Sequence, residues 1–106
     1  MAKYLIEASY VGEGISGLLK EGGTHRRASV EEMLKSVDGK LESFYFAFGD
    51  KDVIVVADLP DNATAAAVAL KVNAAGLAKC KTTVLMTPEE VDAASKMDVM
   101  YKPPGR

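Results

Sequence analysis

The sequence has one cysteine, one histidine and no tryptophan among its 106 residues, and its formal net charge is only −2. The single thiol, Cys80, excludes an internal disulfide bond and cannot form a cysteine-based zinc site by itself. His25 has no second histidine with which to share a zinc ion, so we expect no metal site. Because a large positive charge is absent, nucleic acid and anionic membranes are disfavoured as partners.

Long hydrophobic runs are absent as well. The apolar stretch near the N-terminus contains Glu7 and is far too short for a signal sequence or a membrane-spanning helix, so we expect a cytoplasmic protein. A length of 106 residues corresponds to one small domain, residues 1–106, with a single core. A core of this size is the kind that a partner subunit often completes.

Four segments have the patterns of strands. Residues 3–10 alternate, with Tyr4, Ile6, Ala8 and Tyr10 on one face. Residues 39–60 read as two strands joined by a tight turn, and residues 78–86 form a fourth strand. In the first hairpin strand, alternation places two sets on opposite faces: Glu42, Phe44, Phe46 and Phe48, and Leu41, Ser43, Tyr45 and Ala47. The second hairpin strand is almost continuously β-branched, which is typical of a strand covered on both faces.

The segments between the strands have helical spacing. Apolar residues predict a helix that is broken at the glycine pair 22–23, with Thr24 as the N-cap of its second half. A second, alanine-rich helix is predicted through Ala75, capped by Asp61 or Asn62. These two helices connect the strands in the order βαββαβ.

The end of the chain adds two further features. Thr87 is followed by proline and two glutamates, which is typical of the start of a short helix, and residues 97–106 are expected to be extended. The predicted fold is therefore α+β: a ferredoxin-like βαββαβ domain with a four-stranded antiparallel sheet, a short C-terminal helix and an extended tail. Two helices cover one face of such a sheet, and we expect a second subunit to cover the other in a homodimer or a higher oligomer.

Three segments together resemble the GYD domain family, which is related to the dimeric α/β-barrel superfamily: residues 20–27, 39–49 and 87–90. The resemblance covers nearly the whole chain. It implies a ferredoxin-like protomer whose sheet packs against the sheet of a partner, and it implies no activity. At the hairpin turn, Lys51 stands where the family usually has tyrosine, a departure that leaves the fold unaffected. Relatives in the superfamily have pockets between sheet and helices.

The best candidate site is the run Thr24, His25, Arg26 and Arg27 after the glycine pair. Free N–H groups at a helix start and an arginine fork suit a carboxylate, phosphate or enolate oxygen. Helical geometry places at least one of the two arginines at the inward face. A surface or interfacial salt bridge would explain the same residues without a function.

His25 and four other side chains are candidates for the same pocket or for chemistry. His25 is a candidate catalytic base or haem ligand, although a lone helical histidine is more often exposed. Asn73 lies on an apolar helix and is either a structural bridge or a pocket group, and Tyr45 and Tyr10 are phenolic donors. Cys80 is either a plain strand cysteine or a thiol activated by the neighbouring lysines.

Two functions from different classes are consistent with these residues. The first is a small oligomeric binding or regulatory module with a pocket for an anionic ligand, bound by Thr24, Arg26, Arg27, Asn73 or Tyr45. The second is a cofactor-independent enzyme, similar to a monooxygenase or an isomerase, acting on a small anionic or enolisable substrate with His25 as the base. No motif requires a cofactor, and haem bound by His25 is a third alternative.

Overall fold

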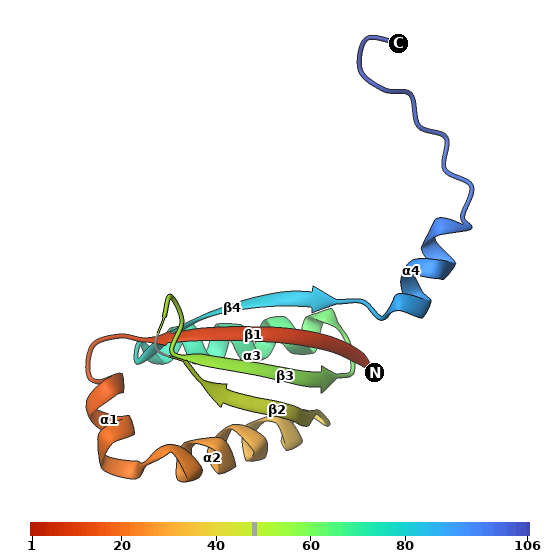
Figure 1. Ribbon diagram of the computed structural model, residues 1–106. Coiled ribbons are helices and arrows are strands. Elements are labelled where there is room, and N and C mark those ends of the chain that lie inside the picture. The colour runs from red at the N-terminus through yellow and green to blue at the C-terminus, as the bar shows by residue number, and fades with distance from the viewer. Residues whose placement is uncertain (48) are drawn as a thin grey trace.

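The computed structural model of the chain describes residues 1–47 and 49–106, so Phe48 lies outside the described residues. Figure 1 shows the elements in the predicted order, and the α+β class is confirmed. The elements are β1 (Ala2–Tyr10), α1 (Gly14–Glu21), α2 (Gly23–Lys35), β2 (Lys40–Phe46), β3 (Val53–Leu59), α3 (Asn62–Ala75), β4 (Ala78–Leu85) and α4 (Pro88–Ser95).

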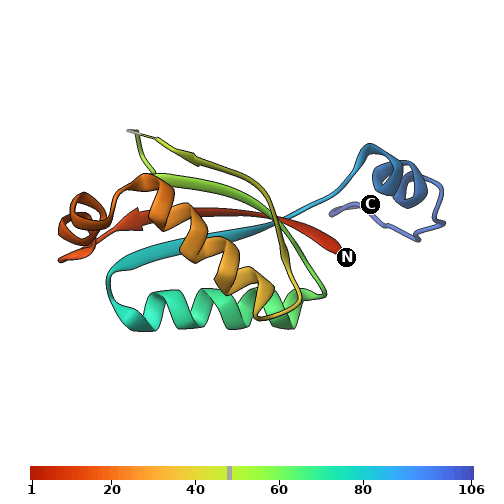
Figure 2. The ribbon, with the colours of Figure 1, turned by 90° about the horizontal axis from the view of Figure 1, so that it is seen from below.

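The four strands form one antiparallel sheet in the order β2-β3-β1-β4, with β2 and β4 at its edges. This order is consistent with a ferredoxin-like fold. Figure 2 shows α2 and α3 on the same side of the sheet, as right-handed crossovers require. The other side, which we call the outer face, is not covered by any described helix.

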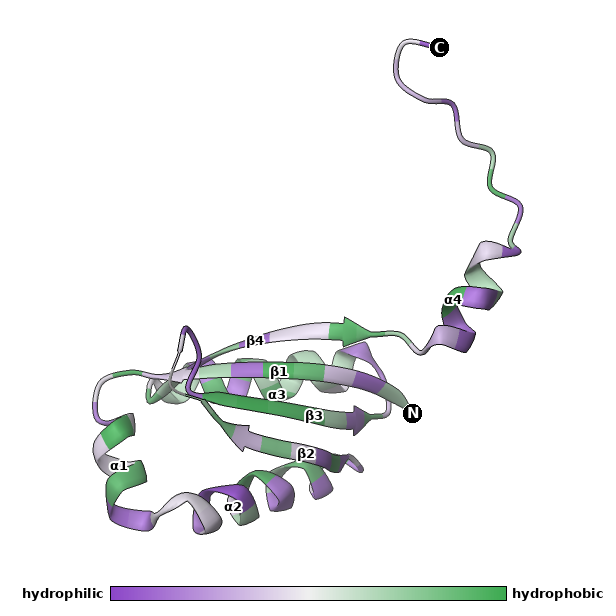
Figure 3. Cartoon of the chain, in the orientation of Figure 1, coloured by the Kyte–Doolittle hydropathy of each residue, from purple (hydrophilic) through white to green (hydrophobic). Residues whose placement is uncertain are grey.

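The core lies between the sheet and these two helices. Along β3 buried and half-buried residues alternate, and Figure 3 shows this strand as apolar over most of its length. Tyr4 of β1, Leu34 of α2 and Leu59 of β3 are the largest fully buried side chains. The other β3 residues that face the helices, Val53, Val55 and Ala57, belong to the same cluster. The opposite side of β3, with Ile54 and Val56, is only half-buried within the protomer.

The faces predicted for the start of β2 are wrong. The pairing of β2 with β3 shifts between Leu41 and Ser43, so a β-bulge adds one residue there. Leu41 therefore packs on the core together with Phe44 and Phe46. Glu42, expected beside the phenylalanines, instead contacts Lys3 on the outer face. Alternation alone cannot reveal such an insertion, because one extra residue reverses every side chain before it.

The break predicted at the glycine pair is confirmed. Gly22 has φ = 85°, a left-handed conformation that separates α1 from α2 and favours glycine. A Cβ on Gly23 would lie 2.9 Å from the ring of Phe46, so this glycine lets α2 approach β2. The N-cap of α2 is Gly22, and the prediction that Thr24 is the cap is wrong. The turn at Gly22 starts the helix early and leaves Thr24 inside its first turn.

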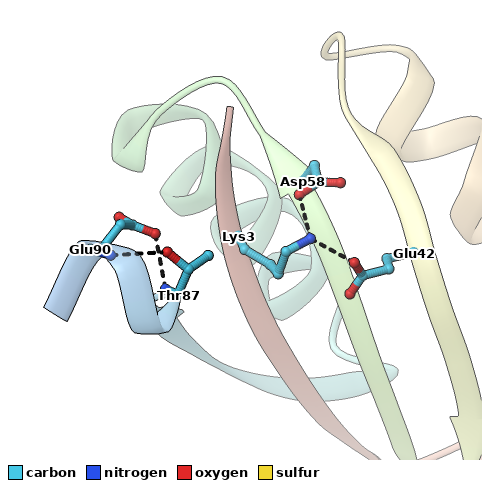
Figure 4. A network of polar contacts seen from close by, with 5 residues as sticks. All are labelled: Lys3, Glu42, Asp58, Thr87 and Glu90. Atoms are coloured by element: carbon cyan, nitrogen blue, oxygen red, sulfur yellow. Dashed lines mark hydrogen bonds and ion pairs between the residues drawn. The ribbon is translucent and has the colours of Figure 1, made fainter. Parts of the chain in front are cut away.

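The other predicted helix starts are confirmed. The carboxylate of Asp61 accepts a hydrogen bond of 2.8 Å from the backbone N–H of Thr64 at the start of α3. Thr87 and Glu90 form a reciprocal capping box at α4, drawn in Figure 4. None of the described helices combines the length and apolarity needed to cross a membrane.

The outer face has an apolar centre and a charged border. Register places the following side chains on it: Lys3, Leu5, Glu7, Ser9, Ser43, Tyr45, Ile54, Val56, Asp58, Lys79, Lys81, Thr83 and Leu85. At one end the ammonium of Lys3 lies 2.7 Å from Glu42 and 2.9 Å from Asp58, which joins β1 to β2 and β3 (Figure 4). These contacts raise the pKa of Lys3 above its ordinary value.

Candidate functional site

A cavity of about 70 Å³ lies between the sheet and helices α2 and α3, and we call it the inner cavity. Most of its lining is aliphatic or aromatic, contributed by all four strands and both helices. The side chains with polar atoms are Tyr10, Arg26 and Cys80. The remaining lining residues are Ile6, Ala8, Val30, Met33, Leu34, Phe44, Val53, Val55, Val68, Val72 and Ala78.

A second cavity of about 390 Å³, the outer cavity, lies between α1, α2 and the C-terminal end of α3. It shares Tyr10, Arg26, Met33, Val72 and Ala78 with the inner cavity, so the two adjoin. Its charged side chains are of both signs: Glu13, Glu21, Arg26 and Lys71. Apart from the region around Arg26, the outer cavity therefore does not favour a ligand of one particular charge.

The break between α1 and α2 positions Arg26 at the junction of the two cavities. Its backbone N–H bonds to the carbonyl of Gly22 at 3.2 Å in the first turn of α2. Its guanidinium Nη1 lies 3.6 Å from Oε1 of Glu21, the last residue of α1. The side chain is neither buried nor fully exposed, so it can contact a ligand inside and water outside.

Tyr10 is the second polar residue that lines both cavities. At the end of β1, its backbone N–H donates a 2.9 Å hydrogen bond to the carboxylate of Asp52, which fixes this end of the strand. Burial raises the pKa of the Tyr10 phenol; the charge of Arg26 opposes the shift, and Glu21 and Asp52 add to it. The phenol therefore stays protonated at neutral pH and can donate a hydrogen bond.

Cys80 contributes to the inner cavity as an apolar lining group. Burial raises the pKa of its thiol, and Sγ lies 3.9 Å from the carbonyl oxygen of Ala69. The neighbouring Lys79 and Lys81 point to the opposite face of the sheet, since strand residues alternate. They do not activate the thiol, which favours the interpretation of Cys80 as a plain strand cysteine.

The other sequence candidates lie apart from the inner cavity. His25 has a side chain that is 66% exposed, and its Nδ1 lies 3.1 Å from Oε2 of Glu21. Thr24 and Arg27 line a shallow hollow of about 260 Å³, together with Gly23, Phe44 and Phe46; of these residues only Phe44 also lines the inner cavity. The predicted run after the glycine pair is thus divided: Arg26 faces inward, and its neighbours do not.

Asn73 and Tyr45 also lie elsewhere. The side-chain oxygen of Asn73 accepts a 2.9 Å hydrogen bond from the backbone N–H of Cys80, so it bridges α3 and β4. Tyr45 is 70% exposed on the outer face, on the opposite side of the sheet from Arg26. The structure does not bring either side chain to the cavities.

Glu21 is a site residue that the sequence did not single out. It contacts both Arg26 and His25, and no motif marks it, because its role depends on the angle between two helices. The one signal in the sequence that could have identified Glu21 is its spacing of four residues from His25, across the glycine pair.

The described residues contain no group of three or more metal-ligating side chains. His25 does not line the inner or the outer cavity, so the arrangement does not fit a haem held there by this histidine. Two polar side chains line both cavities, one a guanidinium and the other a neutral phenol. Both are hydrogen-bond donors, and together they suit an oxygen anion.

The fold and the cavity define the class of protein: a ferredoxin-like α+β domain with a mainly apolar cavity between its antiparallel sheet and its helices. The family model described as GYD domain matches residues 4–95, so the chain belongs to the GYD domain family. No curated protein and no solved structure matches the chain significantly.

Proposed function

We propose that the protein is a binding module for a small molecule that has a compact apolar group and one carboxylate or similar oxyanion. The observation that carries the proposal is that Arg26 and Tyr10 line both cavities, at the junction between them. The apolar group of the ligand would enter the inner cavity. Its anion would meet the guanidinium and the phenol.

Size and chemistry support this class of ligand. A cavity of about 70 Å³ has space for a short alkyl chain, and the outer cavity of about 390 Å³ has space for a larger polar part. A guanidinium binds a carboxylate with two parallel hydrogen bonds, and such charge-assisted bonds are stronger away from water. A neutral phenol beside it donates a further bond.

Within the inner cavity, the protonation states favour binding over catalysis. A cofactor-independent enzyme would need a base beside the substrate. Tyr10 and Cys80 have raised pKa values and therefore keep their protons at neutral pH. The predicted base, His25, contacts Glu21 instead and lines neither cavity.

The proposal includes self-association through the outer face. The apolar centre of this face consists of Leu5, Ile54, Val56 and the exposed ring of Tyr45. An apolar centre with a charged border is the usual composition of a protein interface. Light scattering across a dilution series tests this part. We expect a dimer or a larger assembly, and a monomer at every concentration would overturn it.

The ligand site is tested by titrating the protein with acetate, butyrate and benzoate, followed by amide and arginine side-chain NMR shifts. We expect saturable shifts around Arg26 and Tyr10, and butyrate should bind more tightly than acetate. Arg26→Gln should weaken binding at least about tenfold, since bonds to charged groups contribute about 1.5–3 kcal/mol.

Arg27→Gln is the matched control, because Arg27 is one residue away and lines the shallow hollow. It should bind the three acids as the parent does. If Arg27→Gln abolishes binding and Arg26→Gln leaves it unchanged, the site lies in the shallow hollow and the proposal is wrong. The absence of shifts with all three acids would also overturn it.

A further inference from the structure

The last part of the chain leaves the body of the domain. Residues 88–106, which we call the C-terminal arm, are all exposed. Figures 1 and 2 show the arm projecting from the end of β4, away from α1 and α2. The chain measures 58 × 32 × 23 Å and has a radius of gyration of 17.0 Å. A compact domain of this length has a radius of gyration of about 13 Å.

The arm has the composition of a segment that is buried on a surface. Its large apolar side chains are half to fully exposed: Val91, Met97, Val99, Met100 and Tyr101. A soluble protein rarely exposes so many large apolar residues in one continuous segment unless they form an interaction site. The eight residues of α4 have a complete capping box, yet a helix this short is marginal in water without packing.

Charge identifies the surface that would receive the arm. Helix α4 contains Glu89, Glu90 and Asp92 and no basic residue. Because Glu90 is used in the capping box, Glu89 and Asp92 are left for a partner. Strand β4 contains Lys79 and Lys81 and no acidic residue, and register places both on the outer face.

These two lysines are available for a partner. Both side chains are exposed. Neither forms an ion pair with any described residue, although Glu7 lies opposite Lys81 on β1. An acidic helix placed along this part of the outer face would therefore gain two opposite charges.

The arm leads away from these lysines in its own chain. Lys79 and Lys81 lie near the start of β4, and α4 begins beyond its end. Each strand residue spans about 3.3 Å, so the strand itself separates them by more than about 10 Å, and the arm leads away from it. In two sheets stacked face to face with antiparallel strands, the end of β4 in one copy lies over the start of β4 in the other.

We propose that the C-terminal arm docks on the outer face of a second copy of this chain, with Glu89 and Asp92 facing Lys79 and Lys81 of that copy. Twofold symmetry makes the exchange reciprocal, so each sheet receives one arm. The apolar residues of the arm are then buried beside the sheet-to-sheet contact, at the β4 edge of the outer face. This inference rests on the proposed self-association and is independent of the ligand.

The test is a charge reversal read by sedimentation velocity across a dilution series. One variant carries Lys79→Glu and Lys81→Glu, and the other carries Glu89→Lys and Asp92→Lys. Each variant alone places like charges at both contacts, and its dimer should dissociate at a concentration at least about tenfold higher than the parent. An equimolar mixture restores opposite charges at both contacts, so it should form a heterodimer about as stable as the parent dimer.

Every outcome decides the question. A monomeric parent would overturn the self-association and assign the arm to a different protein. If the parent is a dimer and the two variants dissociate as it does, the sheets pair without the arm and this inference alone is wrong. If both variants are monomers and their mixture stays monomeric, the lysines and acids do not face each other. The titrations with acetate, butyrate and benzoate test the ligand site at Arg26 separately.

Discussion

The carboxylate of Glu21 lies 3.6 Å from the guanidinium of Arg26, at the junction of the inner and outer cavities. The other oxygen of this carboxylate lies 3.1 Å from His25 Nδ1. Glu21 ends α1, and both of its partners belong to α2, so these contacts span the break at Gly22. An anionic ligand would have to compete with Glu21 for the same guanidinium.

The first prediction follows from this competition. Glu21→Gln removes the competing charge and should increase the affinity for butyrate about two- to fivefold, because a partly exposed ion pair contributes about 0.2–1 kcal/mol. Isothermal titration calorimetry measures the change. Glu13→Gln is the control, since Glu13 lines the same outer cavity and forms no ion pair with Arg26 in the described structure. An affinity that is unchanged in Glu21→Gln would contradict the competition.

Local pattern was sufficient to predict most of the fold. Alternation identified the face of β1 that carries Tyr4 and Tyr10, and the capping residues Asp61 and Thr87 identified two helix starts. The bulge at Leu41 could not be predicted, because it depends on how β2 pairs with a distant strand.

The site was predictable only in part. Helical geometry correctly indicated that one of the arginines borders the inward face, and Arg26 does. The position of Glu21 depends on the angle between α1 and α2, and the exposed position of Tyr45 depends on which side of the sheet the helices cover. Both are tertiary properties that a single sequence does not contain.

The second prediction concerns the close approach that positions α1. A Cβ on Gly14 would overlap the carbonyl oxygen of Leu77, a backbone atom that cannot rotate away. Gly14→Ala should therefore destabilise the protein by about 1–3 kcal/mol, as overpacking does. It should also displace α1 from the outer cavity. Thermal unfolding followed by circular dichroism measures the loss.

Gly17→Ala is the matched control on the same helix. No atom lies within 4 Å of a Cβ added at Gly17. Alanine is a better helix former than glycine by about 0.5–1 kcal/mol, so this variant should unfold at the same or a higher temperature than the parent. If Gly14→Ala is as stable as Gly17→Ala, the contact with Leu77 does not position α1.

The third prediction tests a buried hydrogen bond between β1 and α3. Tyr4 is fully buried, and its hydroxyl donates to the side-chain oxygen of Asn62 at 2.6 Å. Tyr4→Phe removes this bond and should lower the free energy of unfolding by about 1 kcal/mol in urea titrations. Tyr45→Phe, at an exposed ring, should change it by less than about 0.5 kcal/mol. Equal effects of the two substitutions would contradict the burial of the Tyr4 hydroxyl.

The last prediction concerns stability at alkaline pH. Burial raises the pKa of the Cys80 thiol above its ordinary value of 9.0 and that of the Tyr10 phenol above 10.0. The folded state therefore holds these protons more tightly than the unfolded state does. The resulting stabilisation is fully present below the ordinary values and is lost as the pH rises through the raised ones.

Urea unfolding at a series of pH values measures this loss. The parent should become progressively less stable above pH 9.0, and Cys80→Ala should lose less stability than the parent between 9.0 and 10.0, where the thiol of the unfolded chain titrates ahead of its phenols. Tyr10→Phe should differ from the parent mainly above 10.0. Lys3 also has a raised pKa, but its contribution is lost only above its ordinary value of 10.5, so it does not obscure the first interval. If the free energy of unfolding falls with pH equally steeply in Cys80→Ala and in the parent below pH 10.0, the thiol is not buried as a neutral group.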